Sequence, residues 1–358
     1  MTRPPLDIGD PAPWFSAASS VDSRPMAFDE LAGLPILLFF FGSAGRADVA
    51  AALSSLDPGG EIFDGQRALF LGIGSDPEDF KRGRLPNRAG RLYLLDASGN
   101  AARQFGVAAT PATSTADAVR PTAFLLSPAL QILNIIPFNR ADEFVQRSTS
   151  LLEALLASPP SGQNAPVLIV PHVFDAVFCR RLIELYEAAG GREIGSIENK
   201  GQMVERFDPA FRKRLDYYIA DDDALQKCKE MLARRLLPLV FRAFQFPTTR
   251  IERYLVGCYD ADSGGYFRPH RDNTAPPVAH RRFALTILLN EGYEGGDLRF
   301  PEFGDQRFKA APGDAIVFSC SLLHEVTPVT LGSRYAFISF LYDEHSQKIR
   351  DAYAKQHA

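Results

Sequence analysis

No cysteine precedes Cys179 in this 358-residue chain, so thiol chemistry is excluded from its first half. None of the later cysteines forms a C-x-x-C pair, and each lies in an apolar helix or strand pattern. We therefore expect buried free thiols rather than disulfides or zinc ligands. These cysteines are Cys179, Cys228, Cys258 and Cys320.

Long apolar runs and an excess of charge of one sign are also missing. The longest apolar run, 35–41, is too short to span a bilayer, and the first residues lack the apolar core of a signal peptide. The net charge is −4, the isoelectric point is about 5.9, and acidic and basic residues are interspersed. We therefore expect a cytoplasmic protein without a membrane or nucleic-acid partner.

The length of the chain, with 46% hydrophobic residues, favours two domains. Residues 158–166 combine prolines with small polar residues, a composition typical of an exposed domain boundary. The predicted division is a first domain at 1–157, a linker at 158–166 and a second domain at 167–345.

Strand-like and helix-like segments alternate in the first domain, which predicts an α/β fold with a mainly parallel, covered sheet and a final hairpin at 127–129. The predicted strands are 35–41, 68–73, 91–95, 121–126 and 131–136, and the predicted helices are 47–56, 77–82, 101–105 and 142–156. The small-residue segment 108–118 is predicted to be a loop.

The opening 9–15, the apolar strand 37–41 and Pro121-Thr122 resemble the thioredoxin-fold peroxiredoxins. That family carries its peroxide-reducing cysteine in the loop after the second strand, where this chain reads Gly-Ser-Ala-Gly-Arg-Ala-Asp at 42–48. A serine hydroxyl does not replace a thiolate, so we expect a redox-inactive domain. Its remaining roles are homodimerisation, docking of a substrate protein or support of the second domain, and we favour support or a dimer contact.

The second domain opens with a short strand and two helices. Asp175 is a plausible N-cap before an apolar stripe that stops at Gly190, and a second helix follows the acidic run 221–223. From residue 251 the pattern changes to short strands separated by turns, which favours a sandwich or jelly roll. The predicted strands are 251–259, 283–290, 297–300, 314–320 and 335–342.

His270 and Asp272 are two residues apart, so on an extended strand their side chains leave the same face. His324, at the end of the apolar run that starts at Ala315, would complete two imidazoles and one carboxylate, a set that holds Fe(II) and leaves half of its positions open. The alternative is an exposed turn in which His270 and Asp272 only bond each other.

The order and spacing of seven residues and turns resemble those of Fe(II)- and 2-oxoglutarate-dependent dioxygenases of the prolyl 4-hydroxylase type. They are Tyr259, His270, Asp272, the turn 294–300, the turn 312–314, His324 and Arg334. The resemblance implies a double-stranded β-helix (jelly roll) with supporting helices, with Fe(II), 2-oxoglutarate and O2 as its requirements and ascorbate as a reductant. It implies that His270, Asp272 and His324 hold iron. Arg334, Tyr259 and Thr286 would bind 2-oxoglutarate.

The resemblance implies hydroxylation of a C–H bond, on a prolyl or other peptidyl residue or on a small molecule. Two alternatives stay open: a non-catalytic scaffold, and a cupin-like iron enzyme that does not use 2-oxoglutarate. The loop around His280, with nearby charged residues, would shape either the substrate entrance or a solvated rim. These neighbours are Arg268, Arg271, Arg282, Asp297 and Arg299.

Overall fold

A computed structural model describes residues 5–19, 25–109, 119–157, 164–193, 196–199, 203–206 and 208–357. The chain forms two compact units: residues 1–163 with 301–304, and residues 164–300 with 305–358. Most of the predicted loop at 108–118 and most of the predicted linker at 158–166 lie outside the described residues.

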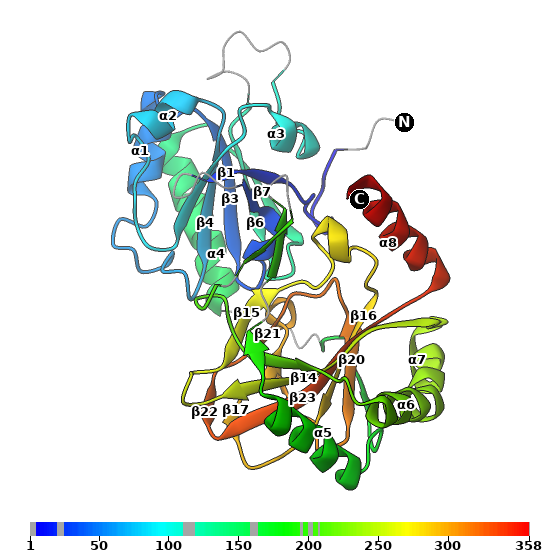
Figure 1. The fold of residues 1–358 in the computed structure, drawn as a ribbon. Coiled ribbons are helices and arrows are strands. Elements are labelled where there is room, and N and C mark those ends of the chain that lie inside the picture. The colour runs from blue at the N-terminus through cyan, green and yellow to red at the C-terminus, as the bar shows by residue number, and fades with distance from the viewer. Residues whose placement is uncertain are drawn as a thin grey trace. The chain divides into compact units, whose positions relative to one another are not determined.

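The first unit is built on one seven-stranded sheet in the order β2-β1-β5-β4-β3-β6-β7 (Figure 1). Only the β3–β4 and β4–β5 pairs are parallel, so the expectation of a mainly parallel sheet is wrong. The predicted final hairpin is present as the antiparallel β6–β7 pair. The strands are β1 (Ser16–Ser19), β2 (Pro25–Ala27), β3 (Ile36–Gly42), β4 (Leu69–Gly74), β5 (Arg91–Leu95), β6 (Thr122–Leu126) and β7 (Ile132–Pro137).

The central strand β3 is buried along its whole length because helices cover both faces of the sheet. Leu37, Phe39 and Phe41 pack with residues of α1 and α4, whereas Leu38 and Phe40 pack with residues of α3. This α/β arrangement is thioredoxin-like, as predicted. The helices are α1 (Ala47–Ser55), α2 (Pro77–Lys81), α3 (Asn100–Gln104) and α4 (Ala141–Ala157).

The second unit contains a large sheet in the order β8-β20-β16-β23-β14-β13-β9. Its long central strands, β14 and β23, are antiparallel, with a register shift between Glu252 and Leu255. The strands of this sheet are β8 (Leu168–Val170), β9 (Arg192–Glu193), β13 (Leu215–Tyr218), β14 (Arg250–Asp260), β16 (Phe283–Leu288), β20 (Ala315–Ser319) and β23 (Ser333–Tyr342).

A smaller sheet, in the order β12-β15-β21-β18-β19, completes the jelly roll of the second unit (Figure 1). Its strands are β12 (Arg212–Lys213), β15 (Tyr266–His270), β18 (Leu298–Arg299), β19 (Arg307–Phe308) and β21 (His324–Val326). Two further pairs are β10 (Ser196–Asn199) with β11 (Met203–Arg206) and β17 (Glu294–Gly295) with β22 (Val329–Leu331).

The two faces of the large sheet have different roles. Val256, Leu285 and Phe337 pack against the helices in one apolar core, as the predicted supporting helices require. Asp175 caps α5 by accepting from the backbone N–H of Phe178, and Asp221 caps α6 in the same way. The helices of this unit are α5 (Ala176–Ala189), α6 (Asp222–Met231), α7 (Leu237–Phe244) and α8 (Glu344–His357).

The opposite, inner face of the large sheet carries Tyr259, Arg334 and Ile338, and it is this face that surrounds the candidate site. Ile338 and Thr286 are cross-strand partners and only partly buried, although β16 and β23 have neighbours on both sides. Partial exposure at the centre of a sheet means that solvent reaches this inner face.

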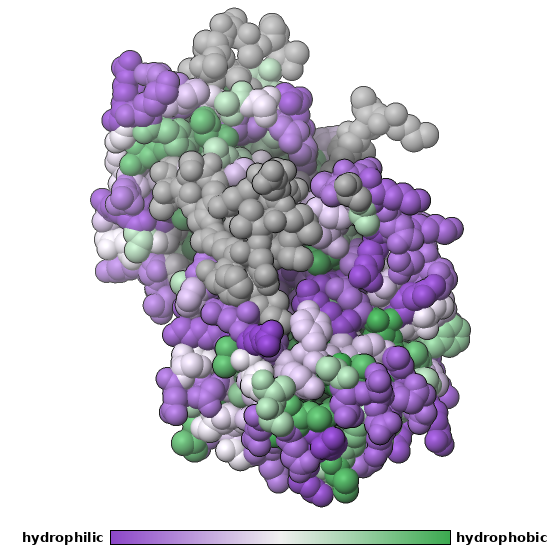
Figure 2. All heavy atoms as spheres, viewed as in Figure 1, coloured by the Kyte–Doolittle hydropathy of each residue, from purple (hydrophilic) through white to green (hydrophobic). Residues whose placement is uncertain are grey.

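The surface of the described residues is mostly hydrophilic. In the view of Figure 2, hydrophobic residues lie in small separate groups. No helix among the described residues has the length and apolar character needed to cross a membrane. All four cysteines are free and buried, as predicted.

Candidate metal centre

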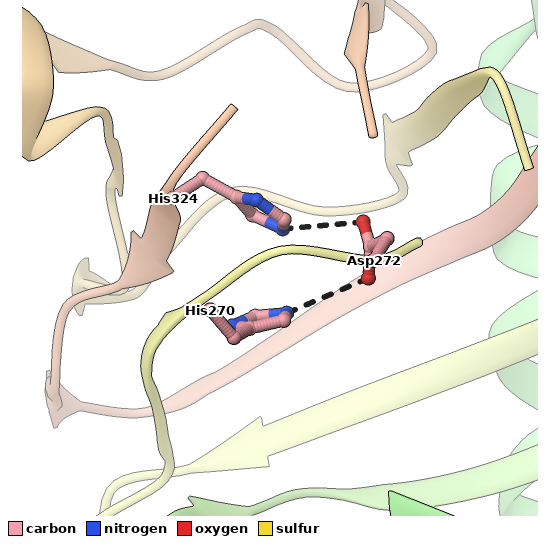
Figure 3. A group of neighbouring side chains, drawn as sticks. All are labelled: His270, Asp272 and His324. Atoms are coloured by element: carbon pink, nitrogen blue, oxygen red, sulfur yellow. Dashed lines mark ion pairs between the residues drawn. The ribbon is translucent and has the colours of Figure 1, made fainter. Parts of the chain in front are cut away.

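His270, Asp272 and His324 converge on one point inside the jelly roll (Figure 3). Their possible ligand atoms all lie within 4.8 Å of one another. The Nε2 atom of His270 lies 3.6 Å from Oδ1 of Asp272, and Nε2 of His324 lies 3.3 Å from Oδ2. Ligands on one face of an octahedral ion about 2.1 Å away are about 3 Å apart, so small movements would bring these three atoms to a shared ion.

Both imidazoles are oriented by the backbone. Nδ1 of His270 lies 2.8 Å from the carbonyl oxygen of Arg268, and Nδ1 of His324 lies 3.0 Å from that of Leu322. A carbonyl only accepts a hydrogen bond, so each Nδ1 carries the proton and each Nε2 presents a lone pair. A metal-binding histidine usually has this second hydrogen bond, which fixes its tautomer and ring orientation.

Electrostatics favour the protonation states that a metal requires. Burial, together with the neighbouring His270, lowers the pKa of His324 to about 4, so its ring is neutral at neutral pH. Burial alone would raise the pKa of Asp272, but His324 and His270 outweigh it and hold this pKa well below its usual range. The group therefore offers the neutral imidazole of His324 and one ionised carboxylate.

The backbone reaches this arrangement differently from the sequence-based expectation. His270 is the last residue of β15, and Asp272 lies beyond the strand in a bend, so the two are not on one continuous strand. His324 does not close β20, which ends at Ser319, but opens β21 after a turn. The β15–β21 pairing places His324 directly opposite His270, and this register brings the two rings together.

Arg334 lies on the same inner face, at the start of β23, and is 3% exposed. Its Nε and the hydroxyl of Tyr293 are buried without a hydrogen-bond partner among the described residues. Gly296, at a φ of +65°, lies so close that a Cβ there would be 2.7 Å from Cδ of Arg334. An unpartnered guanidinium N–H and a tyrosine hydroxyl fit a ligand carboxylate, because a buried anion needs a charged, hydrogen-bonding partner.

Tyr259 is the cross-strand partner of Arg334, and the Arg334 guanidinium carbon lies 5.2 Å from the centre of its ring. Arg214 donates to the Tyr259 hydroxyl at 3.2 Å and forms a bidentate pair with Asp216. Because arginine only donates, the Tyr259 proton remains available for another acceptor. Thr286 lies on the same inner face but opposite Ile338, four residues along β23 from Arg334.

Sequence reasoning missed Tyr293, Arg214 and Asp216. Tyr293 stands just before the glycine turn 294–296, and its proximity to Arg334 depends on the fold of that turn. Arg214 lies just before β13 and Asp216 is its second residue. Only the pairing of β13 with β14 turns the two side chains toward Tyr259. The pattern Arg-x-Asp at the start of a strand is the only signal of this pair that the sequence offers.

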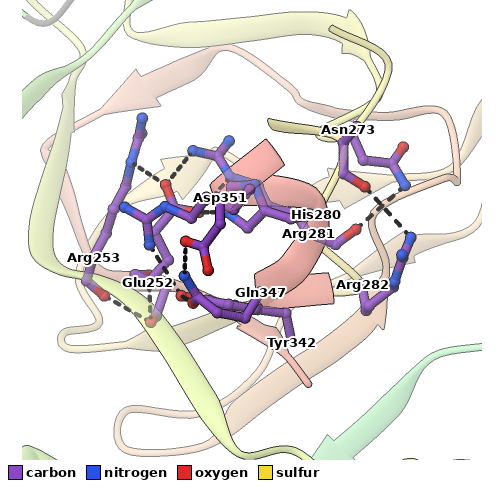
Figure 4. A network of polar contacts seen from close by, with 12 residues as sticks. Glu252, Arg253, Asn273, His280, Arg281, Arg282, Tyr342, Gln347 and Asp351 are labelled. Carbon is purple, nitrogen blue, oxygen red and sulfur yellow. Dashed lines mark hydrogen bonds and ion pairs between the residues drawn. The ribbon is translucent and has the colours of Figure 1, made fainter. Parts of the chain in front are cut away.

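A buried ionic network lies at the other end of β14 (Figure 4). Glu252 accepts from both Nε and an Nη of Arg281, at 3.0 and 2.7 Å, and its Oε2 lies 2.7 Å from Nε2 of His280. Arg281 and His280 are therefore buried partners of Glu252 rather than part of an exposed loop. Two predicted rim residues are partly buried and also have partners, since Arg282 bonds Ser346 and Arg299 bonds Glu325.

Replacing Glu252 by glutamine is expected to lower the free energy of unfolding by about 3–5 kcal/mol, because it leaves the buried Arg281 guanidinium without its carboxylate. Urea unfolding of the full chain measures this change. Glu344→Gln, which breaks the exposed pair with Arg250, is the matched control and should have little effect.

A pH series provides a second measurement of the same network. The pKa of Glu252 is lowered because His280 and Arg281 outweigh burial, so its stabilisation is present above the ordinary value of 4.5 and is lost as the pH falls below it. Wild type should therefore lose more stability below pH 4.5 than Glu252→Gln does. If the free energy of unfolding fell equally with pH in the two proteins, Glu252 would not be the group responsible for the loss of stability.

In the first unit, Ser43 stands in the loop where the peroxiredoxin family has its cysteine. Its hydroxyl is buried and donates to Asp76 at 3.0 Å or to Asp79 at 3.3 Å, while it accepts from the backbone N–H of Gly45. Arg84 pairs with Asp79 at 3.0 Å. The serine is thus a hydrogen-bonded structural group.

Comparison with known protein families supports this description of the second unit. The sequence profile of the 2OG-Fe(II) oxygenase superfamily matches residues 254–342. A PKHD-type hydroxylase of Shewanella oneidensis is 30% identical over 184 residues, which is 48% of this chain and 76% of that protein. A second PKHD-type hydroxylase, from Shewanella sp. strain MR-7, is 32% identical over 184 residues, again 48% of this chain and 76% of the relative.

Solved structures resemble each half of the chain. A prolyl-4-hydroxylase of Pseudomonas putida is 20% identical with a TM-score of 0.38, over 50% of this chain and 94% of that protein. The peroxidoxin BcpB of Mycobacterium tuberculosis is 24% identical with a TM-score of 0.37, over 42% of this chain and 98% of that protein.

Proposed function

The chain belongs to the 2OG-Fe(II) oxygenase superfamily and is an Fe(II)- and 2-oxoglutarate-dependent hydroxylase, and we propose that His270, Asp272 and His324 are its metal ligands. The observation that carries this proposal is the convergence of three ligand atoms with both Nδ1 atoms held by backbone carbonyls. When bound, iron with 2-oxoglutarate and O2 supplies the oxidising chemistry, and 2-oxoglutarate leaves as succinate and CO2.

We propose that the protein's own contribution is to bind and orient the reactants. Arg334 and Tyr293 would hold the distal carboxylate of 2-oxoglutarate through their unpartnered donors. Tyr259, fixed by Arg214, would donate its hydroxyl proton to the same co-substrate. Thr286 is the weaker candidate because it lies four residues along β23 from Arg334, on the exposed part of the inner face.

We propose a C–H bond of a prolyl or other peptidyl residue as the site of hydroxylation. Support comes from the PKHD-type hydroxylases to which this chain is similar. A scaffold without turnover would have no use for two oriented imidazoles beside an ionised carboxylate. An iron enzyme without 2-oxoglutarate would not need the orphaned donors around Arg334. Ascorbate would keep the iron reduced between turnovers.

For the first unit we propose a redox-inactive role in support or homodimer contact, with residues 1–157 as its domain and 167–345 as the oxygenase domain. The hydrogen-bonded Ser43 supports the absence of peroxide chemistry. We also propose a cytoplasmic location, because four free thiols suit a reducing compartment.

Succinate formation tests the proposed function. The full chain with Fe(II), O2 and 2-oxoglutarate should release succinate, and chelation of the metal with EDTA should abolish this release until Fe(II) is added back. Anaerobic calorimetry should show that 2-oxoglutarate binds only after Fe(II). Succinate release that persists in EDTA would contradict the proposal.

A further inference from the structure

The inner face around the metal group carries more arginine than carboxylate. Phe318 lies on this face, because its ring is 4.6 Å from that of His324. Ala284 is the cross-strand partner of both Phe318 and Phe340, so all three side chains lie on the same face of the sheet. Four guanidiniums gather here besides Arg334, and Asp216 and Glu252 are the carboxylates that pair with them. These arginines are Arg212, Arg214, Arg253 and Arg281.

Arg212 approaches the metal group through one aromatic ring. It is the cross-strand partner of Phe267, and its guanidinium carbon lies 5.4 Å from the centre of that ring. Phe267 in turn stacks on His270, with ring centres 3.6 Å apart. Among the described residues Arg212 has no carboxylate within ion-pair distance, and it is only partly buried. Its charge therefore lies beside the Phe267–His270 stack without a counterion among the residues that the structure describes.

Arg253 is held toward the same face by an unusual backbone conformation. It lies in the irregular part of β14 and has a φ of +65°, which a side-chain-bearing residue seldom adopts. Its guanidinium carbon lies 5.8 Å from the ring centre of Phe340, and its Nε is 3.4 Å from Glu252, whose two oxygens already bind Arg281. Backbone strain of this kind is typical of functional sites.

Charges within this group are unbalanced. Four arginines face two carboxylates, which leaves two positive charges. Burial and the neighbouring Arg214 lower the pKa of Arg212, and burial and Arg281 lower that of Arg253. By contrast, Asp216 outweighs burial and raises the pKa of its partner Arg214. The excess thus resides on Arg212 and Arg253.

The co-substrate does not account for this excess. Fe(II) at +2, 2-oxoglutarate at −2, Asp272 at −1 and Arg334 at +1 would already sum to zero. Arg253 also lies at the opposite end of β14 from Tyr259, roughly 20 Å along the strand from the Arg334 end. Arg212 has no carboxylate partner among the described residues, and Arg253 shares Glu252 with Arg281, so both guanidiniums can bind a further anion.

We propose that Arg212 and Arg253 bind a carboxylate of the substrate that is hydroxylated, so that this enzyme acts on an anionic molecule. The proposal rests on the proposed function and adds the substrate class. The carboxylate belongs either to a small carboxylic acid or to an acidic side chain of a peptide.

Two matched probe pairs test the proposal by calorimetry on the anaerobic full-length complex with Fe(II) and saturating 2-oxoglutarate, at constant ionic strength. One pair is the α-amide of N-acetylaspartate and the α-amide of N-acetylasparagine, which differ only in the side-chain carboxylate, and the other is a blocked aspartyl-prolyl pentapeptide and its asparaginyl counterpart. The acidic member of one pair should bind at least about tenfold more tightly than its neutral partner, as expected for a charge-assisted hydrogen bond. The pair that shows the difference identifies the source of the carboxylate.

Variants assign this preference to the two arginines. Arg212→Gln and Arg253→Gln should each remove most of the tenfold preference, whereas Arg212→Lys should retain part of it. Arg242→Gln removes the same charge from the exposed surface of α7 and should leave it intact. Because Arg212 has no carboxylate to lose, Arg212→Gln should melt no lower than wild type, whereas a structural ion pair would give a lower melting temperature.

Equal binding within both pairs, or no binding by any probe while Fe(II) and 2-oxoglutarate bind, would overturn this inference and leave the proposed function standing. A preference that survives both glutamine variants would also overturn it. Failure of Fe(II) and 2-oxoglutarate to bind at all would instead contradict the proposed function.

Discussion

Asp272→Ala is expected to reduce succinate formation by at least about 100-fold, since loss of a group that merely orients a ligand already costs up to this much. Asp272 is the only carboxylate in the group, and it lies between the two Nε2 atoms. Without it, the two imidazoles would offer a divalent ion no negatively charged ligand. Iron affinity should fall together with turnover.

Anaerobic titration with Fe(II), followed by succinate measurement under air, checks this prediction. The matched control is Asp305→Ala, which removes a carboxylate that is 92% exposed and paired with Arg299. This control should bind iron and turn over like wild type. Iron-dependent succinate release within a few-fold of wild type in Asp272→Ala would remove Asp272 from the metal centre.

The sequence predicted the elements of the first unit because their signals are local. The apolar run at 35–41 became the fully buried β3, and in the second unit Asp175 and Asp221 cap helices as their positions predicted. By contrast, β1 (Ser16–Ser19) consists of small residues without a period, and only its pairing with β2 and β5 makes it a strand. The first unit's mixed strand directions follow from such long-range pairing.

In the site, spacing predicted which residues meet but not how they meet. His270 and His324 face each other because β15 pairs with β21, a register that no local pattern contains. The role of these residues as metal ligands stays a prediction. Partners formed across strands, such as Glu252 with Arg281, were invisible for the same reason. Arg253 depends on a strand irregularity that sequence periodicity does not reveal.

Replacing Arg334 by glutamine is expected to raise the KM for 2-oxoglutarate by at least about 100-fold, with a smaller effect on kcat. Removing one member of a buried ion pair costs about 3 kcal/mol or more, and each 1.4 kcal/mol corresponds to tenfold in affinity. The orphaned Nε of Arg334 and hydroxyl of Tyr293 would no longer meet the carboxylate together. Succinate release at varied 2-oxoglutarate concentrations measures both constants.

Two further variants separate the charge of Arg334 from its position. Arg334→Lys keeps the charge but loses the planar fork, so its KM should lie between those of wild type and Arg334→Gln. Gly296→Ala keeps the arginine but would place a Cβ 2.7 Å from its Cδ, so it should also raise KM. A normal KM with a reduced kcat in Arg334→Gln would instead place this arginine outside the co-substrate pocket.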